Sequence, residues 1–253
     1  MAKTEMGQAG ISIANLEAEV GADGLFNGTQ VAGDQGDLSE AKHAPDSQVS
    51  SGASKRRRAD TQYAAGVTGA SRWDGTRAGT YDTAWKRMAE RGENPHGEVD
   101  FVQRYEPSSV LDAGCGTGRV AIELAARGVE VVGTDLDGSM LATAQEKAPE
   151  LTWVQSDLAV LDLGRTFETV VMAGNIILFV QPGTEAAVVA GAARHVAPGG
   201  QLIAGFSLGR GVTADEWDGW CRVAGLTPAE RFSTWAGDPW AADSDYLVAV
   251  ATR

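Results

Sequence analysis

The 253-residue sequence contains only two cysteines, Cys115 and Cys221, too few for the disulfide framework of a small secreted protein. Basic residues are also scarce, because 21 Lys and Arg stand against 34 Asp and Glu, a net charge of −13. An acidic surface repels phosphate groups, so we expect no binding to nucleic acid or to an anionic membrane. No apolar run approaches the roughly 20 residues of a transmembrane helix, and no secretory signal follows Met1. These features favour a cytoplasmic protein.

The first 70 residues contain few large apolar side chains, and Phe26 and Tyr63 are their only aromatic residues. Such a segment buries too little apolar surface to offset its conformational entropy, so residues 1–70 are predicted to be a disordered, low-complexity tail. The basic run 55–58 within it is either part of a solvated linker or an electrostatic docking tag for an acidic partner. The folded domain is expected over residues 71–253.

Helical and extended patterns alternate through this domain. The spacing of Tyr81, Trp85 and Met88 predicts a first helix, and a second is expected from Glu98 to Tyr105, so residues 78–105 form an N-terminal helical segment that could act as a lid. Strands are predicted at 110–111, 129–132, 151–154, 167–172, 201–206, 231–235 and 246–251, with helices at 119–126, 138–147, 186–196 and 213–224. This alternation indicates an α/β fold with a doubly wound, mostly parallel sheet, closed by an antiparallel pair of strands.

A glycine-rich turn follows the first predicted strand, in the segment Asp112-Ala-Gly-Cys-Gly-Thr-Gly118. Glycines allow unusual backbone angles and let a ligand approach the main chain. Their spacing is G-x-G-x-G and not the G-x-G-x-x-G of dinucleotide sites. Asp112 precedes them, and its carboxylate would attract an ammonium group but repel a pyrophosphate. The turn therefore favours a cationic ligand over a dinucleotide.

Two further acidic residues end the next strands. Asp135 stands where a carboxylate can accept hydrogen bonds from both hydroxyls of a ribose, and Leu136 and Met140 could form an apolar wall beside it. Asp157 could accept from an adenine amino group, while the Leu158 backbone could donate to the ring. The alternative is that Asp135 and Asp157 only end strands or cap helices.

In these stretches the sequence resembles the class I S-adenosylmethionine-dependent methyltransferases. The matching segments are VLDAGCGTGR, VVGTDLDGSML, WVQSDL, FETVVMAGN and APGGQLIAGF, and a looser match in YDTAW and NPHGEVDFV resembles an actinobacterial small-molecule subgroup. The resemblance implies a Rossmann-like, seven-stranded sheet with an antiparallel last strand, and S-adenosylmethionine as cofactor. It implies that Asp112, Gly114 and Gly116 lie along the methionine part of the cofactor, Asp135 at its ribose, and Asp157 and Leu158 at its adenine.

Two more residues complete the predicted cofactor site. Cys115 lies between glycines of the turn, where a small residue in a tight loop is a better interpretation than a redox centre. Asn175 follows the fourth strand, at the edge where ligands of an open parallel sheet bind. His195 ends a helix at the opposite edge, so we do not expect it to be catalytic.

A hydroxyl acceptor would need a general base near the transferred methyl group. His96 begins the helix on the ligand edge and is the best candidate, with Glu98 next, although His96 could instead only hydrogen-bond locally at the helix start. The predicted acceptor pocket lies on the same edge and comprises Tyr81, Trp85, Arg210, Trp235, Asp238 and Trp240.

The acceptor is expected to be a small molecule, because the chain has no Asn-Pro-Pro-aromatic motif after its fourth strand and no long recognition insertion. We predict no metal site, and the sequence leaves the oligomeric state open. Two alternatives to a methyltransferase remain at this point. One is an NAD(P)-dependent oxidoreductase on a similar sheet, and the other is a non-catalytic module that binds S-adenosylmethionine, since a fold alone does not establish activity.

Overall fold

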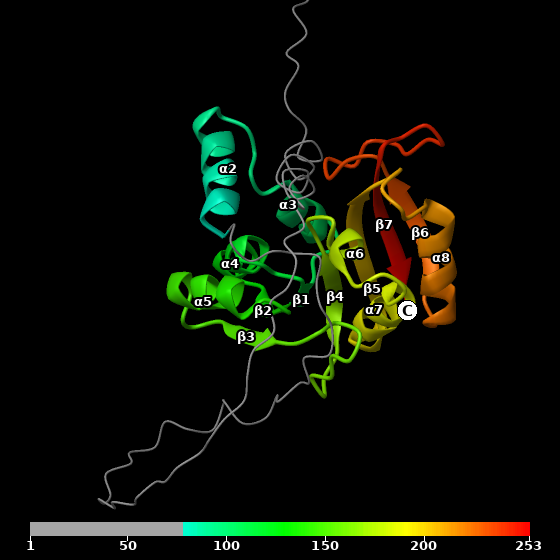
Figure 1. Cartoon of the computed structure of the whole chain (residues 1–253), viewed down its shortest axis with the longest axis horizontal. Coiled ribbons are helices and arrows are strands. Elements are labelled where there is room, and N and C mark those ends of the chain that lie inside the picture. Colours follow the sequence, from blue (N-terminus) through cyan, green and yellow to red (C-terminus); the bar gives the residue numbers. More distant parts are fainter. Residues whose placement is uncertain (1–77) are drawn as a thin grey trace, which may run out of the picture.

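One sheet of seven strands organises the described part of the chain (Figure 1). The structure, a computed structural model, describes residues 78–253, apart from the side chains of residues 78–81 and 84. The strands are β1 (Ser109–Ala113), β2 (Glu130–Asp135), β3 (Thr152–Gln155), β4 (Phe167–Met172), β5 (Val196–Ser207), β6 (Thr227–Phe232) and β7 (Tyr246–Thr252). They lie in the order β3-β2-β1-β4-β5-β7-β6. The predicted tail and its basic run lie outside the described residues.

β7 is antiparallel to both of its neighbours, whereas the pairs among β1 to β5 are parallel. The mostly parallel sheet and its antiparallel last strand were predicted from the sequence and are confirmed. In such a sheet the carboxyl ends of the parallel strands meet at one edge. The loops after β1, β2, β3 and β4 therefore come together, and this edge positions the site described below.

Helices cover both faces of the sheet (Figure 1). They are α2 (Ala78–Glu90), α3 (Gly97–Gln103), α4 (Arg119–Ala126), α5 (Gly138–Lys147), α6 (Ile176–Phe179), α7 (Glu185–Arg194) and α8 (Ala214–Val223). On one face α3 and α4 bury residues such as Phe101 and Leu124 in a cluster that includes Val110 of β1 and Val131 of β2. On the other face α7 and α8 bury Val189 and Trp217. The central strands are apolar on both sides because both sides are covered.

Two elements differ from the prediction. The strand expected at 231–235 runs instead from Thr227 to Phe232, and its weak pattern reflects an edge strand whose side chains are mostly exposed or half-buried. Trp235 looked like a strand residue because it is buried, but it packs from the loop after β6. The short helix α6 was not predicted, since four residues are too few to show helical periodicity.

His195 ends α7 on the edge opposite the site, as expected. Its side chain is buried, Nδ1–H donates to the Gly191 carbonyl (2.8 Å), and Nε2 accepts from the Leu163 N–H (3.0 Å). Burial lowers the pKa of His195, which favours this neutral tautomer. The histidine thus closes the last turn of α7 and ties it to the segment before β4.

Two helical glycines make a matched test of this packing. A Cβ at Gly191 in α7 would lie 1.8 Å from the Leu158 carbonyl oxygen, whereas a Cβ at Gly219 in α8 would meet nothing within 4 Å. We expect Gly219→Ala to raise the free energy of unfolding by about 0.5–1 kcal/mol, the usual helical gain. Gly191→Ala should lower it by about 1–3 kcal/mol through overpacking. Urea unfolding measures both, and equal effects of the same sign would contradict the described contact.

Candidate functional site

The turn from β1 to α4 is held from the neighbouring strand β2. The N–H groups of Gly114 and Cys115 donate to the Thr134 carbonyl (2.8 and 2.9 Å), and the Gly116 N–H donates to Asp135 Oδ2 (2.8 Å). Gly114, Gly116 and Gly118 all have positive φ angles, at +88°, +55° and +83°. Only glycine adopts these angles without strain, so the spacing of the motif follows from the path of the turn.

A cavity opens beside this turn, at the carboxyl ends of the first four strands. It encloses about 890 Å³ of space that protein atoms leave free, a volume that includes open solvent. Its lining comprises Gly114, Cys115, Gly116, Asp135, Leu136, Met140, Ser156, Asp157, Leu158, Ala173, Gly174, Ile176, Phe179, Val180, Gln181, Thr184 and Val188. The cavity therefore brings together eight of the predicted cofactor residues, which come from the segments at and after the ends of β1, β2 and β3.

Asp135 faces the cavity from the end of β2. Its Oδ2 accepts from Gly116 and its Oδ1 accepts from the Asp137 N–H (2.9 Å), so two backbone donors orient the carboxylate. Burial raises the pKa of Asp135, and the two N–H donors oppose that shift. At the end of β3, Asp157 Oδ1 accepts from the Ala159 N–H (2.9 Å), which fixes the turn that carries Leu158. Backbone N–H groups thus orient both carboxylates, from the glycine-rich turn and its own loop for Asp135 and from its own loop for Asp157.

The apolar part of the lining includes residues that the sequence did not single out. A Cβ at Gly114 would lie 2.6 Å from Ile176 Cδ1, and one at Gly116 would lie 3.2 Å from Met140 Cε. Ile176 and Phe179 of α6 therefore form a wall close to the backbone of the glycine-rich turn. The sequence did carry a signal for this wall, since the run Ile176-Ile-Leu-Phe179 directly follows a strand that ends at the ligand edge.

These features fit the parts of S-adenosylmethionine. The glycine backbone offers room for a chain, the Asp135 carboxylate offers acceptors for hydroxyl groups, and Leu136, Met140 and Leu158 offer an apolar slot for a flat ring. In the described lining the charged residues are Asp135 and Asp157, both acidic. That charge favours a ligand with sulfonium and ammonium groups over a pyrophosphate.

Asp112 does not line this cavity. Its side chain is buried, and Oδ2 accepts from the Ala121 N–H (3.1 Å) in the first turn of α4. Burial raises the pKa of Asp112 to about 7, although the Arg119 guanidinium and the Ala121 N–H act in the opposite direction. The structure therefore gives Asp112 the task of fixing α4 behind the turn and not direct contact with a ligand in the cavity.

Asn175 also lies outside the lining. It adopts a left-handed φ of +62°, its N–H donates to the Gly205 carbonyl (3.2 Å), and its Oδ1 accepts from the Ser207 N–H (2.7 Å). These bonds fasten the end of β4 to β5, and the side chain is fully buried. Its predicted direct role is replaced by a supporting one, since it leads the chain into α6.

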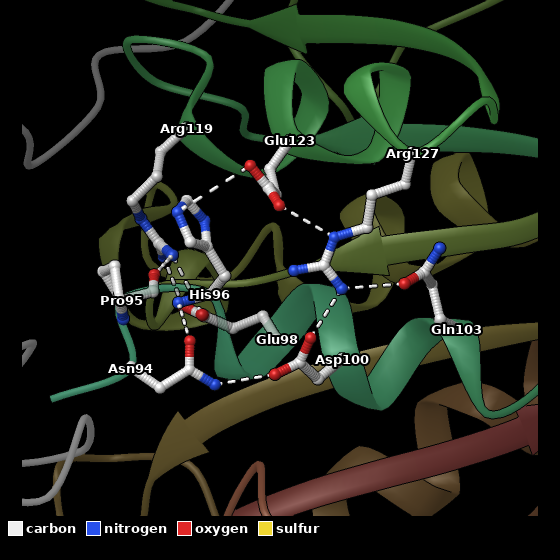
Figure 2. Close-up of polar contacts among 9 residues, drawn as sticks. All are labelled: Asn94, Pro95, His96, Glu98, Asp100, Gln103, Arg119, Glu123 and Arg127. Carbon is white, nitrogen blue, oxygen red and sulfur yellow. Dashed lines mark hydrogen bonds and ion pairs between the residues drawn. The ribbon is translucent and has the colours of Figure 1, made fainter.

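The two predicted base candidates belong to a network of polar contacts between α3 and α4 (Figure 2). Glu98 is fully buried and forms a two-pronged ion pair with Arg119, whose Nη1 donates to Glu98 Oε2 (2.9 Å) while Nη2 contacts Oε1. His96 Nε2 lies 3.8 Å from Glu123 Oε2. Neither side chain lines the cavity. The geometry therefore gives no support to the catalytic roles predicted for them, because Glu98 is committed to Arg119 and His96 faces α4.

The predicted acceptor pocket does not assemble in the described residues. Trp85 is buried, with the Arg119 guanidinium 3.6 Å from its ring centre. Trp235 is buried against Phe101, with ring centres 5.6 Å apart, and its indole N–H donates to the Tyr246 hydroxyl (3.1 Å). Both tryptophans therefore belong to the packing of the fold.

The remaining acceptor candidates are also spread over the surface loops. Asp238 accepts from the Thr234 hydroxyl (2.6 Å) within its own turn. Trp240 packs under the guanidinium of Arg231, 4.9 Å from its ring centre. Arg210 is half-buried but does not line the cavity, and the side chain of Tyr81 lies outside the described residues. These contacts engage Asp238 and Trp240 within and beside their own loop and do not bring them to the cavity.

Comparison with known proteins gives the family. A profile described as a methyltransferase domain matches residues 110–200. The crystal structure of a TehB-like SAM-dependent methyltransferase from Corynebacterium glutamicum is 31% identical, with a TM-score of 0.66, and the match covers 71% of this chain and all of that one. The chain belongs to the class I S-adenosylmethionine-dependent methyltransferases. This family membership agrees with the resemblance seen in the sequence and replaces the nicotinamide alternative.

Two curated relatives of the family come from Streptomyces. A dTDP-3-amino-3,4,6-trideoxy-alpha-D-glucopyranose N,N-dimethyltransferase from Streptomyces venezuelae is 33% identical over 42% of this chain. A cypemycin N-terminal methyltransferase from a Streptomyces species is 34% identical over 41% of this chain. The matches span 46% and 45% of those proteins' own lengths, so they cover about half of each relative.

Residues 78–253 contain no group of three or more His, Cys, Asp or Glu side chains placed to hold a metal ion. None of the helices within the same range has the length and apolar character needed to cross a bilayer.

The raised pKa of Asp112 predicts a pH-dependent stability. The folded chain keeps the Asp112 proton up to about pH 7, while the unfolded chain releases it near about pH 4. The contribution of Asp112 to the free energy of unfolding should therefore fall as pH rises through this window, with a slope approaching about 1.4 kcal/mol per unit. Asp112→Asn removes that slope. Urea unfolding from pH 4.5 to 8 tests this, with the exposed Asp243→Asn as control, and parallel curves for wild type and Asp112→Asn would contradict it.

Proposed function

We propose that this protein transfers the methyl group of S-adenosylmethionine to a small-molecule acceptor. The observation that carries the proposal is the cavity in which the Gly114–Gly116 backbone, the Asp135 carboxylate and the apolar residues around Leu158 meet. Family membership supports the same cofactor, because the structural relative is named as SAM-dependent and matches over its full length.

The residues of the cavity would bind each part of the cofactor separately. Asp135 accepts from the ribose hydroxyls with the oxygen lone pairs that Gly116 and Asp137 leave free. Asp157 and the Leu158 backbone meet the adenine edge, and Leu136 and Met140 pack on its faces. The backbone between Gly114 and Gly116 lies along the methionine part, where a side chain would occupy the space. These contacts would leave the sulfonium at the open side of the glycine-rich turn.

The bound cofactor supplies a methyl group already activated by a sulfonium. The protein then has to hold the acceptor in line and to keep water away. Ile176, Phe179 and Val180 are suited to both tasks, because they line the cavity with apolar surface and Ile176 lies next to the glycine-rich turn. In the transition state the positive charge of the sulfonium spreads over the acceptor. Excluding water has a large effect on the rate at this point, because electrostatic effects are stronger in a medium of low dielectric constant.

Amines are the first acceptors to test. The two curated relatives are named for transfer to nitrogen, one to an amino sugar and one to a peptide N-terminus. A neutral amine carries its own lone pair and needs a proton acceptor only after transfer, whereas a hydroxyl needs a base during transfer. Small amines, amino sugars among them, are therefore the favoured acceptor class.

Calorimetric titration with S-adenosylmethionine, S-adenosylhomocysteine and NADH tests the cofactor. We expect the first two to bind and NADH not to bind. Asp135→Asn should weaken S-adenosylmethionine binding about 10- to 100-fold, because a charged acceptor of buried hydrogen bonds is lost. The matched control is Glu150→Gln, which removes the same charge from an exposed site with no change expected.

Turnover is tested separately with methyl-labelled S-adenosylmethionine and a panel of small amines, followed by mass spectrometry of the labelled product. Label in a small molecule supports the proposal. Binding of NADH in place of S-adenosylhomocysteine would overturn the cofactor assignment. Tight binding of S-adenosylmethionine with no labelled product from host extract would instead identify a non-catalytic binding module.

A further inference from the structure

Helix α2 contacts the glycine-rich turn from outside the cavity. The Thr117 hydroxyl, in the middle of the turn, donates to Asp82 Oδ1 of α2 (2.7 Å). Thr117 is fully buried, while its neighbours Gly116 and Gly118 both have positive φ angles. The one side chain between these two glycines is therefore held by a helix that lies 35 residues earlier in the chain.

A lysine closes this contact into a ring. Lys147, the last residue of α5, places its Nζ 2.6 Å from Asp82 Oδ2 and donates to the Thr117 carbonyl (3.2 Å). Both carboxylate oxygens of Asp82 are thus engaged, and Thr117 is held through its side chain and its main chain together. We call Asp82, Thr117 and Lys147 the outer clip. It joins α2, the turn and α5, three segments that are distant in sequence.

A second contact fixes α2 along the same side. Trp85 follows Asp82 by one helical turn, so the two side chains share a face of α2. The Arg119 guanidinium lies 3.6 Å from the Trp85 ring centre and pairs with the buried Glu98 of α3. Arg119 directly follows Gly118, where α4 begins. The helix is therefore attached to both the middle and the end of the turn.

The inner side of the same turn faces the cavity. Gly116, next to Thr117, donates its N–H to the Asp135 carboxylate, and Gly114 to Gly116 line the cavity. Because the turn contains three glycines, it has more conformational freedom to lose than an ordinary loop. Contacts that fix the turn before a ligand binds reduce the conformational entropy that the turn loses on binding.

We propose that Asp82 is a positioning residue for the cofactor. Through the outer clip it holds the Gly114–Gly118 turn in the shape that the cofactor meets, although none of the described side chains of α2, Asp82 included, lines the cavity. This inference rests on the proposed function, since it concerns the same cofactor site. Loss of the clip should weaken binding of S-adenosylhomocysteine about five- to tenfold, a coupling typical of residues that share one polar network.

The test measures S-adenosylhomocysteine binding by calorimetry in the full chain. The variants are Asp82→Ala, Thr117→Val and the double variant, and Thr117→Ser restores the hydroxyl. S-adenosylhomocysteine lacks the sulfonium charge, which limits any direct effect of the charge removed at position 82. The matched control is Glu90→Ala, which removes an exposed carboxylate from the same helix. Hydrogen exchange of the segment 111–120 reports the turn itself.

We expect the two single variants to weaken binding to a similar extent, and the double variant to be no weaker than either, because all three break one clip. Thr117→Ser should bind within about twofold of wild type, and Glu90→Ala should bind like wild type. Exchange at 111–120 should accelerate in Asp82→Ala, with the other segments of the sheet unchanged. If Asp82→Ala loses its overall fold, Thr117→Val and Thr117→Ser carry the same comparison.

Two results distinguish the positioning role of Asp82 from the cofactor site itself. If wild type binds S-adenosylhomocysteine and both Asp82→Ala and Thr117→Val bind it equally well, the positioning role is wrong while the cofactor site stands. If wild type does not bind it, the proposed function itself is wrong. Additive losses in the double variant would also count against the clip, since they would mean that the two side chains act independently.

Discussion

The turn between β1 and α4 has to run through three left-handed backbone positions within five residues. Such a path cannot stabilise itself, because glycine has no side chain to pack and loses the most freedom on folding. It is held instead from two sides. On the inside the Thr134 carbonyl and the Asp135 carboxylate accept its N–H groups. On the outside Asp82 binds Thr117, so the shape of the cavity depends on both sets of contacts.

The sequence predicted the residues that line the cavity better than the residues that support it from behind. Gly114, Gly116, Asp135, Met140, Asp157 and Leu158 were found because each lies at the end of a strand or within a few residues after it, where the topology of a parallel sheet fixes its location. The same rule placed Asp112 and Asn175 at the right edge. It could not show which way their side chains turn, and both turn into the protein to support α4 and β5.

The predicted base and acceptor residues depended on contacts between distant segments. Glu98 resembles a catalytic carboxylate in sequence, but Arg119, 21 residues later, neutralises it in the buried interior. Trp235 resembles a pocket residue, but Phe101 and Tyr246 enclose it. The periodicity of apolar residues along the sequence does not reveal such contacts between distant residues. The fold was easier to predict, since strands buried on both faces carry a continuous apolar signal, and only the exposed edge strand β6 was displaced.

Helices α2 and α3 were expected to act as a lid. In the described structure Asp82 of α2 accepts a hydrogen bond from Thr117 of the glycine-rich turn, and Glu98 of α3 pairs with Arg119, the residue directly after the turn. A lid would control entry, whereas a contact from behind controls the geometry of the site that a ligand meets. The buried Glu98–Arg119 pair suits control of the geometry. Removing either partner would leave an uncompensated buried charge, so the pair favours this one arrangement even where its net gain in stability is small. Charged residues thus gather behind the turn, and the cavity in front of it stays mainly apolar, which suits the proposed transfer of a methyl group away from water.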